Sequence, residues 1–527
     1  MHTPMKTTKP TLLSPGFRTA TALVLTCALA SPAFPQSTAE INLLRAEMKA
    51  DREAYEARIE ALEKRLAAVE TPPATTTTPA APPANVEQRL TALEKSSQET
   101  AKALDEVFSP TFVAEGLPKD VTRNFELHGY LRSGYGINQE GGGQERVTSP
   151  DGLFQIGPGR LGNEEDTYGE LGFQYAFPVE DENAAKFGFK GLLAFKYAGD
   201  KSNYTVEEGN RADLLIREAF VTASNVMKNA PDVQFWAGQR FYDRHDIHIY
   251  DYYFLDTSGY GGGVEKIDLG PGKLAIAYLG GTDATSLVEG RYSLTKQILD
   301  IRWSELPVFG GKGMLWISPQ YVNGGSGVNP EDTEGIAAGW VQFNNIPKGY
   351  NKASIQYGYG AGYQFNTYVS AVSFQPTGAL EDAQTFQITD QVVWQFSDQL
   401  SLMWAGIVNW EDKGYQAAGE SSADRLFLTT VVRPVYMFTD HIGLAVELGF
   451  DWVDDVRYTP NDDSTTLGKI TIAPVIRPGG SFFSRPEIRI YASYFFWGDA
   501  PGYYQPNGTE PGDNSSWSFG IQAETWW

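Results

Sequence analysis

The chain has 527 residues with 54 glycines, 27 tyrosines, 29 phenylalanines and 12 tryptophans, and only 20% of it is charged. Abundant glycine and aromatic residues are more typical of many strands joined by tight turns than of a helical enzyme. The net charge of −23 excludes the basic surface that nucleic-acid binding requires. The single cysteine, Cys27, excludes an intrachain disulfide and a zinc site built on cysteines.

Residues 1–36 are expected to form a secretory signal peptide. Lys6, Lys9 and Arg18 form a basic leader, and the apolar stretch 19–30 lies next to them. This stretch is too short to span a bilayer as a helix. An interfacial helix is the alternative, but the order of a basic leader and a short apolar core favours export.

Two amphipathic helices are expected after the signal, over residues 37–70 and 86–108. Apolar residues recur at heptad spacing in both, and the sequence offers no other helix that could cover these stripes. The pattern therefore favours a short parallel coiled coil of several chains over a pair of solvated helices. A Pro/Thr/Ala linker, 71–85, separates the two helices, and a second linker, 109–124, precedes the rest of the chain.

From residue 125 to the C-terminus the hydrophobic pattern has a period of two. Every second residue is apolar in 444–452, and 400–410 follows the same pattern except at Gly406. Alternation over about ten residues, interrupted by turn-rich segments, is the signature of a transmembrane β-barrel. Short turns are expected on one side at 396–400 and 438–442, and longer Gly/Asn/Asp-rich loops on the other at 141–159, 323–335 and 417–423.

A soluble β-sandwich or β-propeller could show the same alternation. Three features favour the barrel: aromatic residues cluster at strand ends, the exported chain has no apolar run long enough for a membrane helix, and the sequence ends in Trp526 and Trp527. The fold class expected is therefore an all-β transmembrane barrel preceded by a helical coiled-coil segment.

No enzyme, cofactor or metal site is expected. None of the five histidines lies in a Ser/His/Asp pattern or an HExxH motif. His245, Asp246 and His248 could be considered as metal ligands, but the arginines among them would repel a cation. Glycine-rich residues 259–263 lack the helix and the lysine of a phosphate-binding loop.

Carbohydrate recognition is a better match for residues 240–253, which mix arginine, aspartate, histidine and tyrosine more densely than any other segment. A pyranose ring has an apolar face of C–H groups, which stacks on aromatic rings. Its rim of hydroxyl groups needs charged or polar donors and acceptors. The segment offers both kinds of group.

Specific motifs recur along this region: HGYLRSG at 128–134, RLGNE at 160–164, TYGEL at 167–171, IREA at 216–219, WAGQRFYDRHDIH at 236–248, KGYNK at 348–352, SRP at 484–486 and the terminal Trp-Trp. In this order they resemble the maltoporin family, and the resemblance covers residues 125–527. It implies a homotrimer of 18-stranded barrels in the outer-membrane lipid of a Gram-negative bacterium. It also implies facilitated diffusion of saccharides, with maltose and maltodextrins as the leading candidates.

The resemblance carries over two sets of pore residues and an inward-folded loop at 243–262. The aromatic set consists of Tyr130, Tyr168, Tyr350, Phe483 and Trp526. The polar set, which lines the path and narrows the constriction, consists of Arg132, Arg160, Glu170, Arg217, Arg244, Asp246, Asp251 and Tyr253.

This sequence departs from the family's pattern at two places. A sixth aromatic, which reaches in from a neighbouring subunit, has no counterpart at 206–209, where Tyr204 is the nearest aromatic. The family's disulfide in the first external loop is also absent, because Glu165 stands where one cysteine would be.

The N-terminal helices resemble the coiled-coil extension of sucrose porins, whereas Arg244, Tyr253 and Asp256 match the maltoporin type. The sequence therefore leaves the preferred sugar open, and a channel for sucrose or another oligosaccharide is an alternative. A general diffusion porin is a second alternative. In a third, residues 37–107 form a periplasmic stalk that binds peptidoglycan or a periplasmic protein, and the barrel is only an anchor.

Overall fold

The computed structural model describes residues 124–527 except 150–156, 180, 182, 199–212, 283–294, 324–331, 368–378, 415–423, 455–463 and 499–512. The chain divides into two units, 1–98 and 99–527, and the first lies outside the described residues. The signal peptide, both helices and the linkers expected before the barrel, apart from Asn124, also lie outside them, as do Tyr204 and 206–209.

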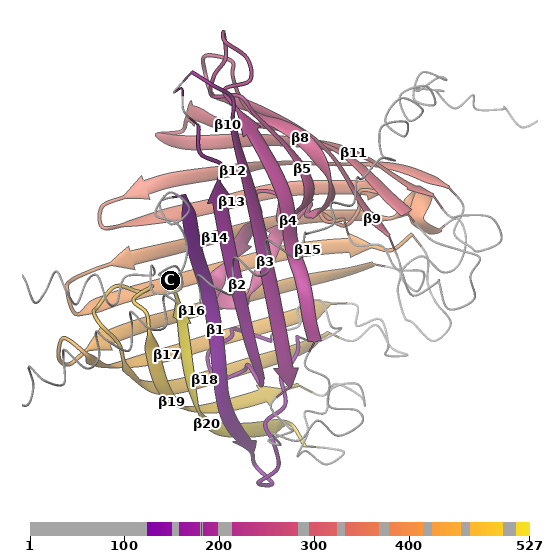
Figure 1. Cartoon of the computed structure of the whole chain (residues 1–527). Helices are drawn as coiled ribbons and strands as arrows, with labels where there is room; N and C mark the ends of the chain where they lie inside the picture. Colours follow the sequence, from indigo (N-terminus) through magenta and orange to yellow (C-terminus); the bar gives the residue numbers. More distant parts are fainter. Residues whose placement is uncertain are drawn as a thin grey trace, which may run out of the picture. The chain divides into compact units, whose positions relative to one another are not determined.

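Eighteen strands form one antiparallel sheet (Figure 1). Each strand pairs with the next one in the chain, and the last pairs with the first, which closes the barrel. The strands are β1 (Phe125–Asn138), β2 (Asp166–Ala176), β3 (Lys186–Ala198), β4 (Asp213–Ser224), β5 (Gln234–Arg240), β8 (Gly259–Asp268), β9 (Lys273–Thr282), β10 (Thr295–Val308), β11 (Gly311–Asn323), β12 (Thr333–Ile346), β13 (Gly349–Gly360), β14 (Gln384–Gln395), β15 (Leu400–Asp412), β16 (Asp424–Met437), β17 (Ile442–Asp454), β18 (Thr465–Ile476), β19 (Glu487–Trp497) and β20 (Ser515–Trp526).

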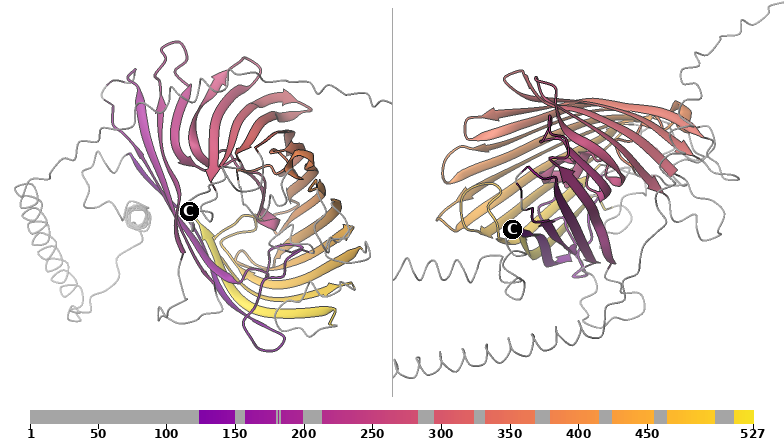
Figure 2. Two further views of the ribbon diagram at one scale, coloured as in Figure 1. Left: turned by 90° about the vertical axis from the view of Figure 1, so that its right-hand side faces the viewer. Right: turned by 45° about the horizontal axis from the view of Figure 1, so that its top comes forward.

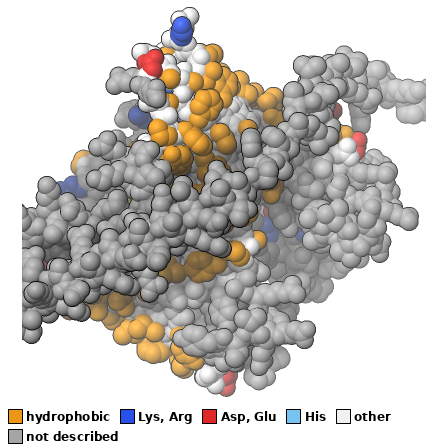
Figure 3. Space-filling model, viewed as in Figure 1, with side chains coloured by type: hydrophobic (Ala, Val, Ile, Leu, Met, Phe, Trp, Pro, Cys, Tyr) orange, Lys and Arg blue, Asp and Glu red, His pale blue; other side chains and the backbone are white. Residues whose placement is uncertain are grey.

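The period-two pattern places apolar side chains outside and polar ones inside. In β17, Leu448 and Phe450 are exposed on the outer wall, whereas Glu447 and Asp451 are fully buried. This distribution of apolar and polar side chains is the reverse of that in a soluble protein, and it suits a wall that faces lipid. Figure 3 shows hydrophobic side chains gathered on the described part of the wall in view, with the few charged ones at its margins.

The connections alternate in length as the sequence predicts. Short turns join β14 to β15 and β16 to β17, at the positions expected. The longer connections lie at the other ends of these strands, but the loop expected at 323–335 is shorter, because Asn323 ends β11 and Thr333 begins β12. The loop expected at 417–423 lies outside the described residues.

One long connection folds into the barrel instead of standing outside it. Residues 241–258, here called the inner segment, link β5 to β8 and contain β6 (His245–Ile247), the 3-10 helix η3 (His248–Tyr250) and β7 (Tyr252–Leu255). Ile247, Ile249 and Leu255 are fully buried in an apolar cluster with inward-facing residues of β11 to β19. The left view of Figure 2 shows the segment inside the ring of strands.

The expected range of the inward-folded loop, 243–262, is therefore wrong at its end. Residues 259–262 belong to β8 and pair with β5 and β9 in the wall. Their glycines suit this position, because a Cβ at Gly261 would lie 2.0 Å from the carbonyl oxygen of Tyr278. Within the described residues no helix is long and apolar enough to cross a membrane, a criterion that does not test strands.

Candidate functional site: the constriction of the barrel

Three neighbouring strands bring predicted aromatic and charged residues together on the inner face of the wall. Tyr130 of β1 lies directly opposite Trp526 of β20 on one side and Glu170 of β2 on the other. Two residues further along β1, Arg132 lies opposite Tyr168 of β2. Aromatic and charged side chains therefore alternate along and across the strands, because inward-facing positions recur every two residues.

The aromatic members of this patch are in contact with one another. The rings of Tyr130 and Trp526 are stacked, with centroids 6.4 Å apart and an interplanar angle of 10°. The Tyr168 ring lies 6.0 Å from that of Tyr130 at a tilt of 54°. All three side chains are half-buried, so the rings are held in place and still face the interior.

Phe483 joins these rings through a histidine of the inner segment. The His248 ring meets Phe483 edge-on at 5.3 Å and Trp526 edge-on at 5.8 Å. Burial, and then the positive charge of Arg160, hold the pKa of His248 well below its usual range. An uncharged His248 therefore extends the run of rings between Trp526 and Phe483.

Tyr350 is the one predicted aromatic that lies apart from this run. It is the second residue of β13 and stacks on Phe343 of β12, with centroids 5.5 Å apart. It packs against the same apolar cluster as the inner segment. The structure thus brings four of the predicted aromatic residues into one connected run and places Tyr350 beside a different partner.

Two of the predicted arginines are buried in ion pairs behind the rings. Arg132 contacts Glu164 at 2.6 Å and Asp166 at 2.5 Å, and its side chain is 5% exposed. Arg160 contacts Glu164 at 2.7 Å and Glu524 at 3.0 Å, and it donates a hydrogen bond of 2.9 Å to the Tyr130 hydroxyl. These contacts fix the guanidinium groups, and Arg160 also fixes the ring of Tyr130.

Arg217 lies at a β-bulge, which explains its inward position. Leu192 of β3 pairs with Glu218 of β4, but Leu193 pairs with Ile216, so Arg217 is an extra residue in the ladder. A bulge of this kind turns two consecutive side chains toward one face. Glu218 is accordingly buried in the interior, where it accepts a hydrogen bond of 3.0 Å from the backbone of Phe241.

Arg244 is held between two aromatic rings of the inner segment. Its guanidinium carbon lies 3.4 Å from the ring centroid of Phe241 and 4.1 Å from that of Tyr253. Burial raises the pKa of Tyr253 to about 12 against the opposing charge of Arg244, so the phenol keeps its proton at neutral pH. The segment therefore presents a positive charge and a hydroxyl donor side by side.

The predicted acidic residues lie on different sides of the inner segment. Asp246 faces β13, where its carboxylate is 3.5 Å from Lys352. Asp251 has a left-handed backbone (φ 49°) and is exposed, with its carboxylate 3.9 Å from Arg132. Glu170 accepts a hydrogen bond from the Tyr168 hydroxyl, which links the polar set to the aromatic one.

The comparison with protein families decides the identity of this barrel. The family model described as LamB porin matches residues 125–527, well over half of the chain. The chain belongs to the LamB porin family. This match covers the same residues as the resemblance to maltoporins found in the sequence, and it confirms that prediction.

Several solved structures resemble this LamB porin more distantly. OpdQ of Pseudomonas aeruginosa is 9% identical, with 76% of this chain and 98% of that chain covered and a TM-score of 0.40. OccAB1 of Acinetobacter baumannii is 11% identical, with coverages of 79% and 99% and a TM-score of 0.42. The outer membrane channel DcaP of Acinetobacter baumannii is 13% identical, with coverages of 76% and 97% and a TM-score of 0.36.

Family and fold together establish the general role of the protein. A closed barrel with an apolar outer wall, in a chain of the LamB porin family, is an outer-membrane channel of a Gram-negative bacterium and not an enzyme. Among the described residues no group of three or more His, Cys, Asp and Glu side chains could hold a metal ion. His245 and His248, considered above as ligands, contact Phe254 and the aromatic run instead.

Sequence reasoning missed the carboxylates that organise the porin's arginines. Glu164 and Glu524 are both buried, and Glu524 contacts Arg160, Arg485 and Arg489 at 2.8 to 3.3 Å. Arg160 and Glu524 are 364 positions apart, so no local spacing reveals the pair. The available signal was the polar, inward-facing position of Glu524 in the last strand, two residues before Trp526.

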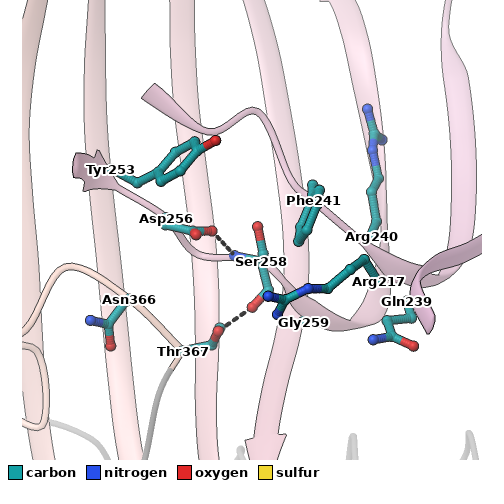
Figure 4. Close-up of a pocket in the computed structure, with 10 residues that line it drawn as sticks. All are labelled: Arg217, Gln239, Arg240, Phe241, Tyr253, Asp256, Ser258, Gly259, Asn366 and Thr367. Atoms are coloured by element: carbon teal, nitrogen blue, oxygen red, sulfur yellow. Dashed lines mark hydrogen bonds between the residues drawn. The ribbon is translucent and has the colours of Figure 1, made fainter. Parts of the chain in front are cut away.

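A cavity of about 410 Å³ lies where the inner segment leaves the wall (Figure 4). Arg217 extends into it from β4, and Phe241, Tyr253 and Asp256 line it from the inner segment. Asp256 accepts a hydrogen bond of 3.0 Å from the backbone of Ser258. Donors, an acceptor and two aromatic rings thus surround one open space next to the constriction.

Proposed function

We propose that this porin conducts saccharides by facilitated diffusion, with maltose and maltodextrins as the leading substrates. The observation that carries the proposal is that the rings of Tyr130, Trp526 and Tyr168 lie next to one another on three adjacent strands, with the Glu170 carboxylate directly opposite Tyr130. A sugar ring needs an apolar surface and hydroxyl partners at the same level of the channel. This patch supplies both at each step.

The mechanism follows from the spacing of the rings. Neighbouring rings in the run Tyr168, Tyr130 and Trp526 have centroids 6.0 and 6.4 Å apart. A sugar unit that stacks on one ring is therefore close to the next ring. Stacking adds about 1 kcal/mol per ring beyond area burial, which guides an oligosaccharide without trapping it. As one hydroxyl leaves a charged partner the next hydroxyl reaches another, so the free-energy profile stays shallow.

The buried ion pairs support this role by fixing the surface before a sugar arrives. Arg160 binds the Tyr130 hydroxyl, and Glu524 accepts a hydrogen bond of 2.9 Å from the same hydroxyl. A preorganised site loses less conformational entropy when it binds a ligand. We therefore propose that Arg132 and Arg160 position the aromatic rings, while Arg217, Arg244 and the Tyr253 hydroxyl meet the sugar directly.

The test is sugar-induced block of the ion current in planar bilayers, measured for a series of maltodextrins and for sucrose. Block that strengthens with the number of glucose units supports the aromatic run as the binding surface. Block by sucrose in preference to maltodextrins supports the alternative channel. A current that no saccharide changes, with a preference among small ions by charge, supports a general diffusion porin.

Two further parts of the proposal concern assembly. We propose a homotrimer, in keeping with the resemblance to maltoporins, and a periplasmic stalk formed by residues 37–107. β1 begins and β20 ends at the side of the short turns. Cross-linking of the intact chain, and of a chain without residues 37–107, tests whether the trimer depends on the stalk.

A further inference from the structure

The inner segment carries the predicted constriction residues and joins the wall strands at its two ends. It leaves β5 after Arg240 and returns to β8 at Gly259. Tyr242 and Asp243 form the first end, and Thr257 forms the second. These three residues, here called the neck, converge on one side chain of β10, Arg302.

Both terminal nitrogens of Arg302 donate hydrogen bonds to the neck. Its Nη1 donates to the carbonyl oxygen and the carboxylate of Asp243 at 2.6 and 3.2 Å. Its Nη2 donates to the Thr257 hydroxyl at 2.8 Å and approaches the carbonyl oxygen of Tyr242 at 3.4 Å. Its guanidinium carbon lies 4.7 Å from the Tyr242 ring centroid, and the side chain is 2% exposed.

A second residue of β10 fixes the guanidinium itself. Asp300 accepts hydrogen bonds from Arg302 Nε at 2.8 Å and from Arg302 Nη2 at 3.2 Å. Asp300 also accepts from the Thr257 hydroxyl at 2.8 Å and from the indole of Trp316 on β11 at 2.9 Å. The side chain of Asp300 is fully buried, so Arg302 is its counter-ion in a place that water does not reach.

We infer that Arg302, fixed by Asp300, is a positioning residue for the constriction: it sets the place of Arg244, Asp246, Asp251 and Tyr253 by fastening the neck on both sides of them. Fourteen positions separate Asp243 from Thr257, and one guanidinium joins them. Arg302 lies behind the neck and touches none of these four side chains in the contacts described. Its effect on a solute is therefore indirect.

Arginine suits this task because its planar fork offers five N–H donors in fixed directions. A lysine at 302 keeps the charge beside Asp300, but its compact ammonium group cannot reach Asp243 and Thr257 together. The far part of the inner segment has its own contacts, such as that of Tyr250 with Thr429 at 2.7 Å. Loss of the fork should therefore loosen the neck without releasing the whole segment.

The experiment compares four forms of the full-length porin in planar bilayers. Arg302→Lys removes the fork and keeps the charge. The double variant Asp300→Asn with Arg302→Met removes both charges, so no unpaired charge remains buried. Lys273→Met with Glu305→Gln is the control, because it removes an exposed ion pair of 2.9 Å that involves the same strand β10.

We expect both Arg302 variants to give noisier salt currents than the control, and maltodextrin block about tenfold weaker than in the unaltered porin. The weakening should appear mainly as faster sugar release, with Arg302→Lys the milder of the two. Salt currents and sugar block that match those of the control would overturn the inference, since a purely structural ion pair predicts that result.

Thr257→Val keeps the inference testable if the charge variants do not assemble. It removes the hydroxyl between Arg302 and Asp300 and leaves no charge unpaired. Noisier current in this variant supports the neck, and an unchanged current contradicts it. The sugar readout rests on the proposed function, but the noise of the salt current does not. If no saccharide blocks the unaltered porin, the proposed function fails while the noise still tests Arg302.

Discussion

Trp526 and Tyr130 are directly paired across the seam where β20 closes on β1, and their rings stack at 6.4 Å. The two residues are 396 positions apart, and only closure of the barrel brings them together. The aromatic surface proposed for sugar transport therefore forms only when β20 pairs with β1. Its neighbours Tyr168 and Arg132 are paired in the ladder between β1 and β2, two residues further along β1.

Removal of one ring from this surface should weaken sugar binding and spare ion flow. For Tyr168→Ala or Trp526→Ala we expect maltodextrin block weakened about fivefold, because each stacked ring contributes about 1 kcal/mol. Salt conductance should stay nearly unchanged. Trp517→Ala is the matched control, since Trp517 is an exposed aromatic residue on the outer wall of the same strand β20.

The first external loop should depend on a buried charged group that anchors its inward part. Glu447 Oε1 accepts from the backbone of Leu161 at 3.0 Å and from Lys469 at 2.7 Å, and Arg433 Nε donates to Glu447 Oε2 at 2.6 Å. Glu447→Gln leaves two buried cations without a carboxylate. We expect the free energy of unfolding in urea to fall by about 3–5 kcal/mol.

Glu305→Gln on β10 is the control for that measurement, because its ion pair is exposed and should change stability little. Equal loss in the two variants would contradict the anchoring role of Glu447. The same loop lacks the family's disulfide, and Glu165 instead accepts a hydrogen bond from the backbone of Arg146. Asn163 adds two hydrogen bonds of 2.8 Å to the backbone of Val147.

The lowered pKa of His248 gives stability a defined pH dependence. Its ordinary pKa is 6.5, and the folded porin binds this proton less readily than the unfolded chain does. The free energy of unfolding should therefore decrease as the pH falls below about 6.5. His248→Phe keeps the ring and should remove this part of the dependence, measured by urea unfolding between about pH 8 and about pH 5. Identical pH profiles for the two proteins would exclude His248 as the cause.

Deletion of residues 37–107 separates transport from tethering. All residues proposed to meet the sugar lie between Tyr130 and Trp526, so block by maltodextrins should be the same in the shortened porin. Binding of the porin to isolated peptidoglycan should be lost in the shortened form if the stalk is the tether. Loss of sugar block in the shortened porin would show that the barrel does not act alone.

The barrel could be predicted from the sequence because the alternation of inward and outward residues is visible within each strand. Inward and outward positions alternate along strands such as β17, so the pattern alone places Leu448 outside and Glu447 inside. The residues proposed to line the pore come from the family's motifs. The predicted end of the inner segment is four residues too late, because the glycine-rich stretch 259–262 is typical of a loop but forms a closely packed part of the wall.

The supporting residues could not be predicted, because their partners are distant in the sequence. The role of Glu524 depends on its contact with Arg160, and the role of Arg302 depends on its hydrogen bonds to both ends of the neck. The bulge at Arg217 depends on the register between β3 and β4, which no local spacing reveals. A signal did exist in β10, where Asp300 and Arg302 stand on the same inward face as Ile298.

The most direct test of the proposed function is a titration of maltodextrins against the ion current of the unaltered porin in a planar bilayer. The proposal predicts a block that saturates with concentration and strengthens from maltose to longer chains, as successive units engage Tyr168, Tyr130 and Trp526. A current that stays the same at every sugar concentration, for every chain length, would contradict it.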